Sequence, residues 1–349
     1  MRLERRTHVP TINLLMAPVW AILAALLPSG LLILSAGVNP FDAYLQIAVS
    51  AVGSRLSITE TLARATPLIL TGLAASVAFR VRLWNIGGEG QFYLGALTTA
   101  AIGHSMLSGV PVLISIFALL LAGAGVGALI LFGPVLLRLR FGVDEVVTTL
   151  LLNFIIILFV SMMIEGPLKD PLAFGWPQSV PVSPEFKLPK LVPRTRLHIG
   201  FIIAVVAAIL VWAVNAKTVF GFESRAAGLN PRAASFSGIS LSKILILVSC
   251  LSGGLAGLAG ALEVTGIKGY VTTDLSPGYG YSGIVVATLA AQNPIGVIGA
   301  ALFVAILFVG ADGMSRALGV PTFIADVIVA ISLLTMLISV MLTNYRVRL

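Results

Sequence analysis

Long uncharged runs of apolar residues alternate with short polar segments along the chain. Several of these runs approach or exceed the roughly 20 residues that a helix needs to cross the hydrocarbon core of a bilayer. We predict ten membrane-spanning helices, at residues 12–36, 60–79, 90–108, 111–137, 143–165, 198–216, 243–266, 282–292, 295–311 and 320–342. The pattern therefore predicts an all-α polytopic membrane protein in which residues 1–349 form a single transmembrane domain.

Composition supports this fold class. Of the 349 residues, 58% are hydrophobic and only 10% are charged, and the mean hydropathy is +1.04. One soluble core cannot hide this much apolar surface, so the bilayer must cover much of it. The basic start followed by an apolar run also suits a cleaved signal peptide, but the run is too long and no clear cleavage site follows. We favour a retained first span.

The net charge of +8 would suggest nucleic acid binding in a soluble domain, but here most basic residues lie in short segments between spans. With a cytoplasmic N-terminus, the cytoplasmic segments collect Arg2, Arg5, Arg6, Arg80, Arg82, Arg138, Arg140, Lys217, Arg225, Arg232, Lys243, Arg346 and Arg348. Cytoplasmic loops of membrane proteins carry an excess of Lys and Arg. We therefore predict a multi-pass protein of the plasma (inner) membrane with both termini cytoplasmic.

The long segment 166–197 falls on the extracytoplasmic side in this arrangement. It is rich in proline, in GPLKDPLAFGWPQSVPVSPEFKLPKLVP, and proline prevents a continuous helix. We expect an extended loop on the outer face. Its pattern fits a simple connector and a docking surface equally well.

Two short crossings, 90–108 and 282–292, each follow a glycine-rich polar stretch: NIGGEGQ in the first half and DLSPGYGYSG in the second. They occupy corresponding places in two halves of five spans each. An odd number of spans gives the halves opposite orientations, and short interrupted spans at matching positions of inverted repeats indicate a substrate path.

The chemistry-bearing residues exclude several functions. The glycines around Glu89 match neither a dinucleotide-binding loop nor a phosphate-binding loop, and no G-x-x-x-x-G-K-[ST] occurs in the chain. His8, His104 and His198 are scattered, so they offer neither a metal site nor a catalytic triad. We predict that this chain is not an enzyme and holds no metal or cofactor of its own.

The most informative polar stretch is KTVFGFESRAAGLNPRAASFSGISLSK, residues 217–243, on the predicted cytoplasmic side. One helical turn is expected to stop at Gly228, and Asn230 can cap a second short helix that begins at Pro231 and closes at Gly238. Such a stiff pair of short helices can transmit a displacement from a partner to the adjoining spans. An ordinary capped loop between two spans fits the pattern too.

Four stretches carry a family resemblance. RAAGLNPRAASFSGIS, followed by SGGLAGLAGALE, resembles the cytoplasmic coupling segment and next helix of the permease subunits of ABC importers of the branched-chain amino acid, ribose and nucleoside type. PLILTGLAASVAFRVRLWNIGGEGQFYLGA and GYSGIVVATLAAQNPIGVIGAALF resemble the nucleoside and simple-sugar branch of that family. Together they cover most of residues 60–310.

The resemblance implies a subunit without ATPase activity. Its expected partners are an ATP-binding cassette subunit that holds ATP and Mg²⁺, a second permease of the same or related sequence, and an extracytoplasmic substrate-binding protein. By position, the residues expected to couple it to the ATP-binding subunit are Arg225, Gly228, Asn230, Arg232 and Gly238. Ser237 departs from the family pattern, where a small apolar residue is expected.

Polar residues inside the membrane are costly unless they meet a partner or a wet cavity. The candidates for lining a substrate path are Asn85, Glu89, Gln91 and Asn153. Structural roles fit two of them as well. Glu89 is suited to cap its own helix, where a carboxylate meets free N–H groups and a favourable dipole, and Asn153 is suited to an interhelical hydrogen bond.

We therefore predict the permease subunit of an ATP-driven importer of nucleosides or related simple sugars, working by alternating access. The first alternative is a secondary transporter driven by an ion gradient, which would need coupling-ion ligands near the membrane midplane. A membrane enzyme lacks a nucleophile, base and metal set here, and a scaffold would not need the segment 217–243 or the broken spans.

Overall fold

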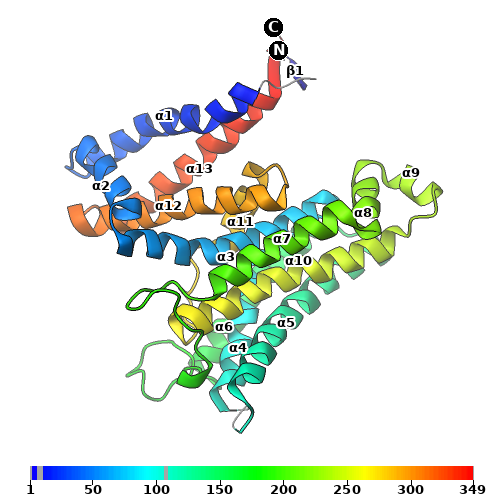
Figure 1. The fold of residues 1–349 in the computed structure, drawn as a ribbon, viewed down its shortest axis with the longest axis horizontal. Coiled ribbons are helices and arrows are strands. Elements are labelled where there is room, and N and C mark those ends of the chain that lie inside the picture. Colours follow the sequence, from blue (N-terminus) through cyan, green and yellow to red (C-terminus); the bar gives the residue numbers. More distant parts are fainter. Residues whose placement is uncertain (1, 6–10, 106–108, 349) are drawn as a thin grey trace. The chain divides into compact units, whose positions relative to one another are not determined.

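The chain folds almost entirely into helices (Figure 1). The computed structural model describes residues 2–5, 11–105 and 109–348. Among these residues, seven helices are long and apolar enough to cross a membrane, and an eighth span results if the pair Leu23–Ser35 and Pro40–Val52, bent by 110°, is counted as one. The all-α prediction is confirmed apart from one short ribbon, whereas length and composition do not confirm ten spans.

Every predicted span nevertheless overlaps a helix. These helices are α1 (Thr11–Ser35), α3 (Arg55–Arg80), α4 (Gly88–Ser105), α5 (Val112–Phe141), α6 (Glu145–Glu165), α7 (Gly200–Lys217), α10 (Leu241–Glu263), α11 (Tyr279–Leu289), α12 (Pro294–Leu318) and α13 (Thr322–Asn344). The two short predicted crossings correspond to α4 and α11, and neither is among the seven spanning helices.

One helix, α2 (Pro40–Val52), was not predicted. Asn39 caps it by accepting the N–H of Phe41, and Pro40 occupies the first helical position, where its fixed φ is suitable and its missing N–H is not needed. Asp42, Gln46 and Ser50 interrupt its apolar residues, so the pattern of the sequence does not predict a span here.

The contacts within the chain define two compact units, which we describe separately. Unit 1 comprises residues 1–64 and 302–349, and unit 2 comprises residues 65–301. In unit 1, α1 packs against α13, and the strands β1 (Arg2–Arg5) and β2 (Tyr345–Arg348) pair as an antiparallel ribbon. Its register places Glu4 opposite Arg346, so the ribbon pairs residues near the beginning of the chain with residues near its end.

In unit 2, α10 packs against both α5 and α4. Small residues allow this close packing: a Cβ on Gly257 would lie 2.2 Å from the carbonyl oxygen of Gly123 on α5. Lipid tails are as apolar as the helix side chains, so the hydrophobic effect does not drive helices together inside a membrane. They associate instead through close van der Waals packing, which small residues allow.

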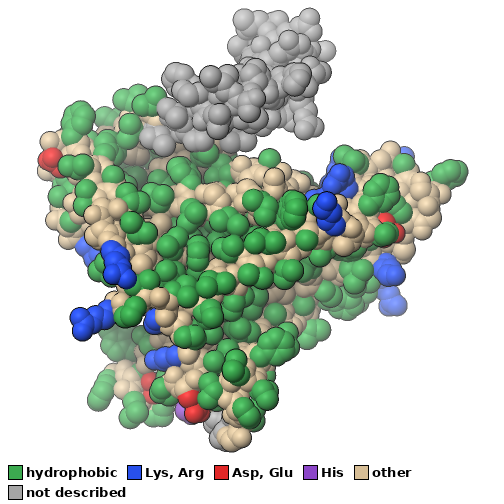
Figure 2. Space-filling model, viewed as in Figure 1, with side chains coloured by type: hydrophobic (Ala, Val, Ile, Leu, Met, Phe, Trp, Pro, Cys, Tyr) green, Lys and Arg blue, Asp and Glu red, His purple; other side chains and the backbone are tan. Residues whose placement is uncertain are grey.

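The two ends of unit 2 carry different structures. The segment 166–197, with the 3₁₀ turn η1 (Pro184–Phe186), and the π-helical turn η2 (Val264–Lys268) lie at one end. The short helices α8 (Val219–Leu229) and α9 (Pro231–Phe236) lie at the other (Figure 1). Figure 2 shows hydrophobic side chains over the visible face between these ends, and Lys and Arg side chains toward them. This is the distribution expected of a membrane-embedded body.

Candidate functional site

Two non-helical segments lead to the N-termini of α4 and α11. Residues 81–87 connect α3 to α4, and residues 269–278 connect η2 to α11. The two N-termini meet, because a Cβ on Gly280 would lie 2.2 Å from the backbone nitrogen of Glu89. Only a glycine fits at this contact, which joins positions 191 residues apart. We call it the junction.

The Glu89 carboxylate lies inside the junction, where the residue is only 3% exposed. Its Oε2 accepts the N–H of Gly280 at 2.6 Å. Gly280 belongs to the first turn of α11, and Glu89 to the first turn of α4. A carboxylate is favoured at the partially positive N-terminus of a helix. Glu89 thus caps α11, whereas the sequence suggested that it would cap its own helix.

Asn85 and Gln91 form a reciprocal amide pair beside the junction. Asn85 Nδ2 donates to Gln91 Oε1 at 3.1 Å, and Gln91 Nε2 donates to Asn85 Oδ1 at 3.0 Å. Asn85 also donates to the Ser252 hydroxyl at 3.1 Å, and this hydroxyl donates to the carbonyl of Ala74 at 2.8 Å. The pair therefore ties the non-helical segment to α10 and α3.

Asn153 on α6 supports the same region from another side and is fully buried. Its Oδ1 accepts the N–H of Gly90 at 2.8 Å, and its Nδ2 donates to the carbonyl of Ile86 at 2.8 Å and to the Tyr281 hydroxyl at 3.3 Å. An asparagine can satisfy backbone groups that the interrupted helices leave unpaired.

The structure thus brings all four path candidates into one buried cluster of hydrogen bonds. Each makes polar contacts within the protein, and none is more than 3% exposed. Their contribution to a substrate path stays a prediction.

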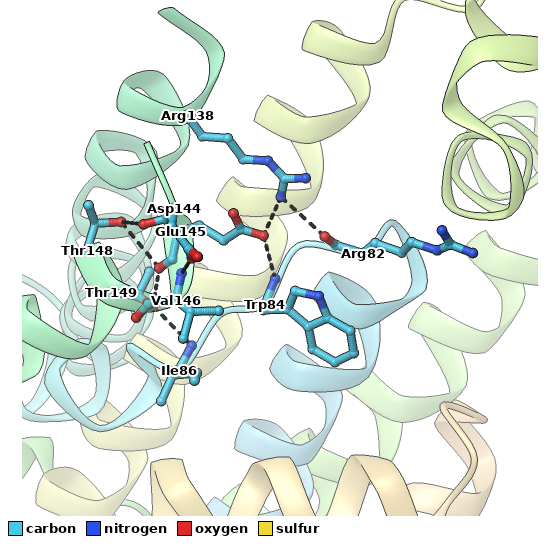
Figure 3. Close-up of polar contacts among 9 residues, drawn as sticks. All are labelled: Arg82, Trp84, Ile86, Arg138, Asp144, Glu145, Val146, Thr148 and Thr149. Carbon is cyan, nitrogen blue, oxygen red and sulfur yellow. Dashed lines mark hydrogen bonds and ion pairs between the residues drawn. The ribbon is translucent and has the colours of Figure 1, made fainter. Parts of the chain in front are cut away.

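A second polar cluster holds the start of the segment 81–87 (Figure 3). Arg138, in the last turn of α5, donates to Glu145 Oε1 at 2.6 Å and to the carbonyl of Arg82 at 3.2 Å. Glu145 also accepts the N–H of Trp84 at 3.3 Å. Sequence reasoning missed this use of Glu145, which depends on residues 61 positions away.

The same cluster organises the start of α6. Asp144 accepts the N–H of Val146 at 2.7 Å and caps the helix. Thr149 donates to the carbonyl of Glu145 at 2.6 Å and accepts the N–H of Ile86 at 3.2 Å. The polar stretch DEVVTT before an apolar run was the available signal, since it is typical of a helix start.

The segment 217–243 forms the two short helices that the sequence predicts. Asn230 Oδ1 accepts the N–H of Ala233 at 3.2 Å, Pro231 begins α9, and Gly238 has a φ of 86°, in the left-handed region that favours glycine. The Ser237 hydroxyl donates to the carbonyl of Ala233 at 3.0 Å. The capping prediction is confirmed.

Gly228 has a different structural role from the predicted one. It does not stop the first helix, because α8 begins at Val219 and continues through Gly228 to Leu229. A Cβ at Gly228 would lie 2.0 Å from the carbonyl oxygen of Arg80, the last residue of α3. Glycine is needed here because α8 rests directly on the end of α3.

Around this contact, the surface of α8 and α9 is exposed. Arg225, Asn230 and Arg232 are exposed. Apolar side chains, which sequence reasoning did not select, are exposed beside them, notably Leu229 at 71% and Phe236 at 96%. Exposed apolar residues among charges are typical of a surface that another protein covers.

At the other end of unit 2, His198 fixes the end of the long segment to α7. Its Nδ1 accepts the N–H of Gly200 at 3.1 Å, and the residue is 1% exposed. Lys190 lies nearby and donates to the carbonyl of Gly266 at 2.6 Å. Burial, assisted by the charge of Lys190, lowers the pKa of His198 to about 4. The ring is therefore neutral at ordinary pH.

Within unit 1, Asp312 on α12 forms an ion pair with Arg64 on α3. Glu60 lies 4.0 Å from the same guanidinium, one helical turn earlier. This pairing accounts for a charge inside an apolar helix, since ionisable groups in such places are normally paired.

The fold and these polar clusters define a membrane protein with interrupted helices and a compact pair of short helices at one end. Residues 57–342 match the family described as "Branched-chain amino acid transport system / permease component". The chain belongs to this family, whose members are transport components rather than enzymes.

Three relatives resemble it over most of its length. The glucose ABC transporter permease protein TsgB13 of Haloferax volcanii is 34% identical over 99% of this chain and 93% of its own. The nucleoside ABC transporter permease protein NupB of Lactococcus lactis is 35% identical over 90% and 88%. The guanosine ABC transporter permease protein NupP of Bacillus subtilis is 34% identical over 93% and 94%.

One solved structure, of a metal-chelate type ABC transporter in an inward-facing conformation, aligns with 92% of this chain and 95% of its own at 13% identity and a TM-score of 0.45. The relatives named above are all permease proteins of ABC transporters. They give no support to a transporter driven by an ion gradient.

Proposed function

We propose that this chain is the membrane-spanning subunit of an ATP-driven importer that carries nucleosides or related simple sugars across the plasma (inner) membrane. The observation that carries the proposal is its similarity, over about nine-tenths of the chain or more, to permeases named for nucleosides, guanosine and glucose. Separate subunits bind ATP and Mg²⁺, and an extracytoplasmic protein delivers the solute. A second permease, of the same or related sequence, completes the path.

The segment 217–243 couples the chain to the ATP-binding subunit through Arg225, Gly228, Asn230, Arg232 and Gly238. Of these, Gly228 is buried and seats the segment on α3, whereas the other four are exposed and face the partner. The caps keep α8 and α9 stiff, and the missing side chain at Gly228 lets α8 rest on the carbonyl of Arg80. A displacement of α8 therefore reaches the end of α3 without a flexible side chain between them. A movement of the ATP-binding subunit is in this way transmitted through α8 to the membrane-spanning helix α3.

From the end of α3 the movement continues along residues 81–87 to the junction. The contacts of Glu145 and Asn153 hold this segment at both ends, so it shifts as one piece with α6. The facing N-termini of α4 and α11 are what two inverted halves of five helices would produce at their centre. The path runs beside the junction, where Asn85, Glu89, Gln91 and Asn153 supply polar groups to the solute when the helices separate.

The distribution of basic residues indicates how the chain is oriented in the membrane. Arg225 and Arg232 on α8 and α9, and Arg138 at the end of α5, lie toward the predicted cytoplasmic side. The chain ends are cytoplasmic by the same rule, and the segment 166–197 is extracytoplasmic.

Charge reversal tests the coupling surface. The double variant R225E/R232E should retain less of the ATP-binding subunit on copurification and lose at least tenfold in uptake, because interface charges of the wrong sign repel. The matched control for copurification is K187E/R194E, which reverses two exposed charges at the opposite end of unit 2 and should retain the ATP-binding subunit as the unmodified protein does. Normal copurification and uptake in R225E/R232E would refute the coupling assignment.

The energy source is tested in vesicles. Uptake by the reconstituted permease should require the ATP-binding subunit, ATP and the solute-binding protein. Robust uptake with an imposed ion gradient and no ATP-binding subunit would overturn the proposal in favour of the secondary transporter.

A further inference from the structure

The segment 166–197 carries a turn with an unusual surface. Residues 171–177, PLAFGWP, form its tip, which we call the loop tip. Leu172, Phe174 and Trp176 are 80%, 100% and 75% exposed. Three large apolar side chains are thus exposed within five residues of one turn, and exposed apolar groups gathered in this way mark interaction sites.

The loop tip is held rigidly. The Asp170 carboxylate accepts the N–H of Leu172 at 2.9 Å and the side-chain amide of Gln178 at 3.0 Å, and the backbone N–H of Asp170 donates to the carbonyl of Gln178 at 3.0 Å. Pro171 and Pro177 restrict the chain on both sides. A rigid tip loses little conformational entropy when it binds, which favours affinity.

The backbone of the tip is also strained in a way that presents an aromatic ring. Phe174 has a φ of 49°, a left-handed conformation that is rare for a bulky residue. Strain of this kind persists only where the surroundings enforce it, and it is concentrated at functional positions. Since Phe174 is fully exposed, the strain is not compensated by packing of its ring within this chain.

The base of the tip is fixed to the end of unit 2. The N–H of Ser179 donates to the carbonyl of Val271 at 2.9 Å, and the N–H of Val180 donates to the carbonyl of Leu168 at 2.9 Å. Figure 1 shows the green loops of this segment extending beyond the helix ends, on the side away from α8 and α9. The tip therefore lies at the end of unit 2 that is opposite α8 and α9.

The charges around the tip indicate the chemistry of its partner. The exposed charges of the same segment are mainly positive: Lys169, Lys187, Lys190, Arg194 and Arg196 are exposed with one acidic residue, Glu185, whereas Asp170 is buried. A complementary surface would place acidic groups around an apolar pocket, and such complementarity sets the register of two proteins.

We propose that the loop tip is the extracytoplasmic anchor of this importer: Phe174 and Trp176 enter an apolar pocket, edged by acidic residues, on the solute-binding protein. This inference rests on the proposed function. Aromatic side chains desolvated at the centre of an interface commonly dominate its binding energy. Removing both rings should therefore weaken docking strongly without changing the membrane-embedded machinery.

The test uses the complete importer in lipid nanodiscs and its purified, solute-loaded binding protein. ATP hydrolysis is measured against the concentration of the binding protein. The double variant F174S/W176S should raise the KM for the binding protein at least tenfold. The maximal rate, and the hydrolysis without binding protein, should stay within twofold of the unmodified importer. W176F, which keeps an aromatic ring, and L191S, which alters the same segment outside the tip, should both leave the KM within twofold.

The outcomes separate the two levels of the proposal. If the unmodified importer is not stimulated by the loaded binding protein, the proposed function fails and the anchor fails with it. If the unmodified importer is stimulated and F174S/W176S has an unchanged KM, only the anchor is overturned. Brominated lipids should quench the unmodified protein and W176F equally; extra quenching that depends on Trp176 would place the tip in the membrane and overturn the anchor.

Discussion

Replacing Glu89 tests whether its carboxylate holds the junction between α4 and α11. In E89A the Gly280 N–H loses its acceptor and stays buried. A hydrogen bond to a charged group contributes about 1.5–3 kcal/mol, and a carboxylate near a helix N-terminus adds about 0.3–1 kcal/mol. With Glu89 only 3% exposed, we expect E89A to lose about 2–4 kcal/mol of stability. E89Q keeps an acceptor oxygen and should lose about half as much.

The assay is thermal unfolding of the permease in nanodiscs, followed by the fraction that remains monodisperse after heating. We expect the midpoint to fall in the order unmodified, E89Q, E89A, with a difference of several degrees between the extremes. The matched control is E185A, which removes an exposed acidic residue on the segment 166–197 and should leave the midpoint unchanged.

An E89A midpoint equal to that of the unmodified protein would refute the structural reasoning about the junction. Uptake measured on E89Q adds a separate readout. Normal assembly with lost uptake would favour a direct role in the path, whereas lost assembly would favour the cap on α11.

Two further predictions concern packing and pH. G257V should prevent assembly of α10 with α5, because even one Cβ would lie 2.2 Å from the carbonyl of Gly123; recovery of folded protein on size exclusion measures this, and normal recovery would contradict the packing. For His198, the folded pKa of about 4 lies below the unfolded value near 6.5, so its contribution to stability is complete above about pH 6.5 and is lost as pH falls toward 4. The unfolding midpoint should therefore fall more steeply between pH 7 and 4.5 in the unmodified protein than in H198Q, and equal slopes would contradict this account.

The sequence predicts local features of the fold well. All ten apolar runs became helices because each is long or uniform enough to favour a helix regardless of its neighbours. The cap at Asn230 and the turn at Gly238 were also recognisable, since both depend on residues within one turn. By contrast α2 was missed, because Asp42, Gln46 and Ser50 interrupt its apolar residues and leave no continuous apolar run.

The candidate site shows where local reasoning ends. Glu89 was identified, but its hydrogen-bond partner lies 191 residues away and depends on how α11 packs. Gly228 was identified as a helix stop, although its actual contact is with Arg80, at the end of another helix. The exposed ring of Phe236 could not be distinguished from a buried one, since an apolar residue in a six-residue helix carries too little periodicity.

The central claim is that this chain moves nucleosides or related sugars with energy from ATP hydrolysed on a partner. The most direct measurement is accumulation of labelled nucleosides, pentoses and hexoses in proteoliposomes that contain both permeases and the ATP-binding subunit, with the binding protein added outside. We predict concentrative uptake of a nucleoside or simple sugar that requires ATP and stops when the ATP-binding subunit is omitted. Uptake that persists without that subunit, or no uptake of any of these solutes, would contradict the account.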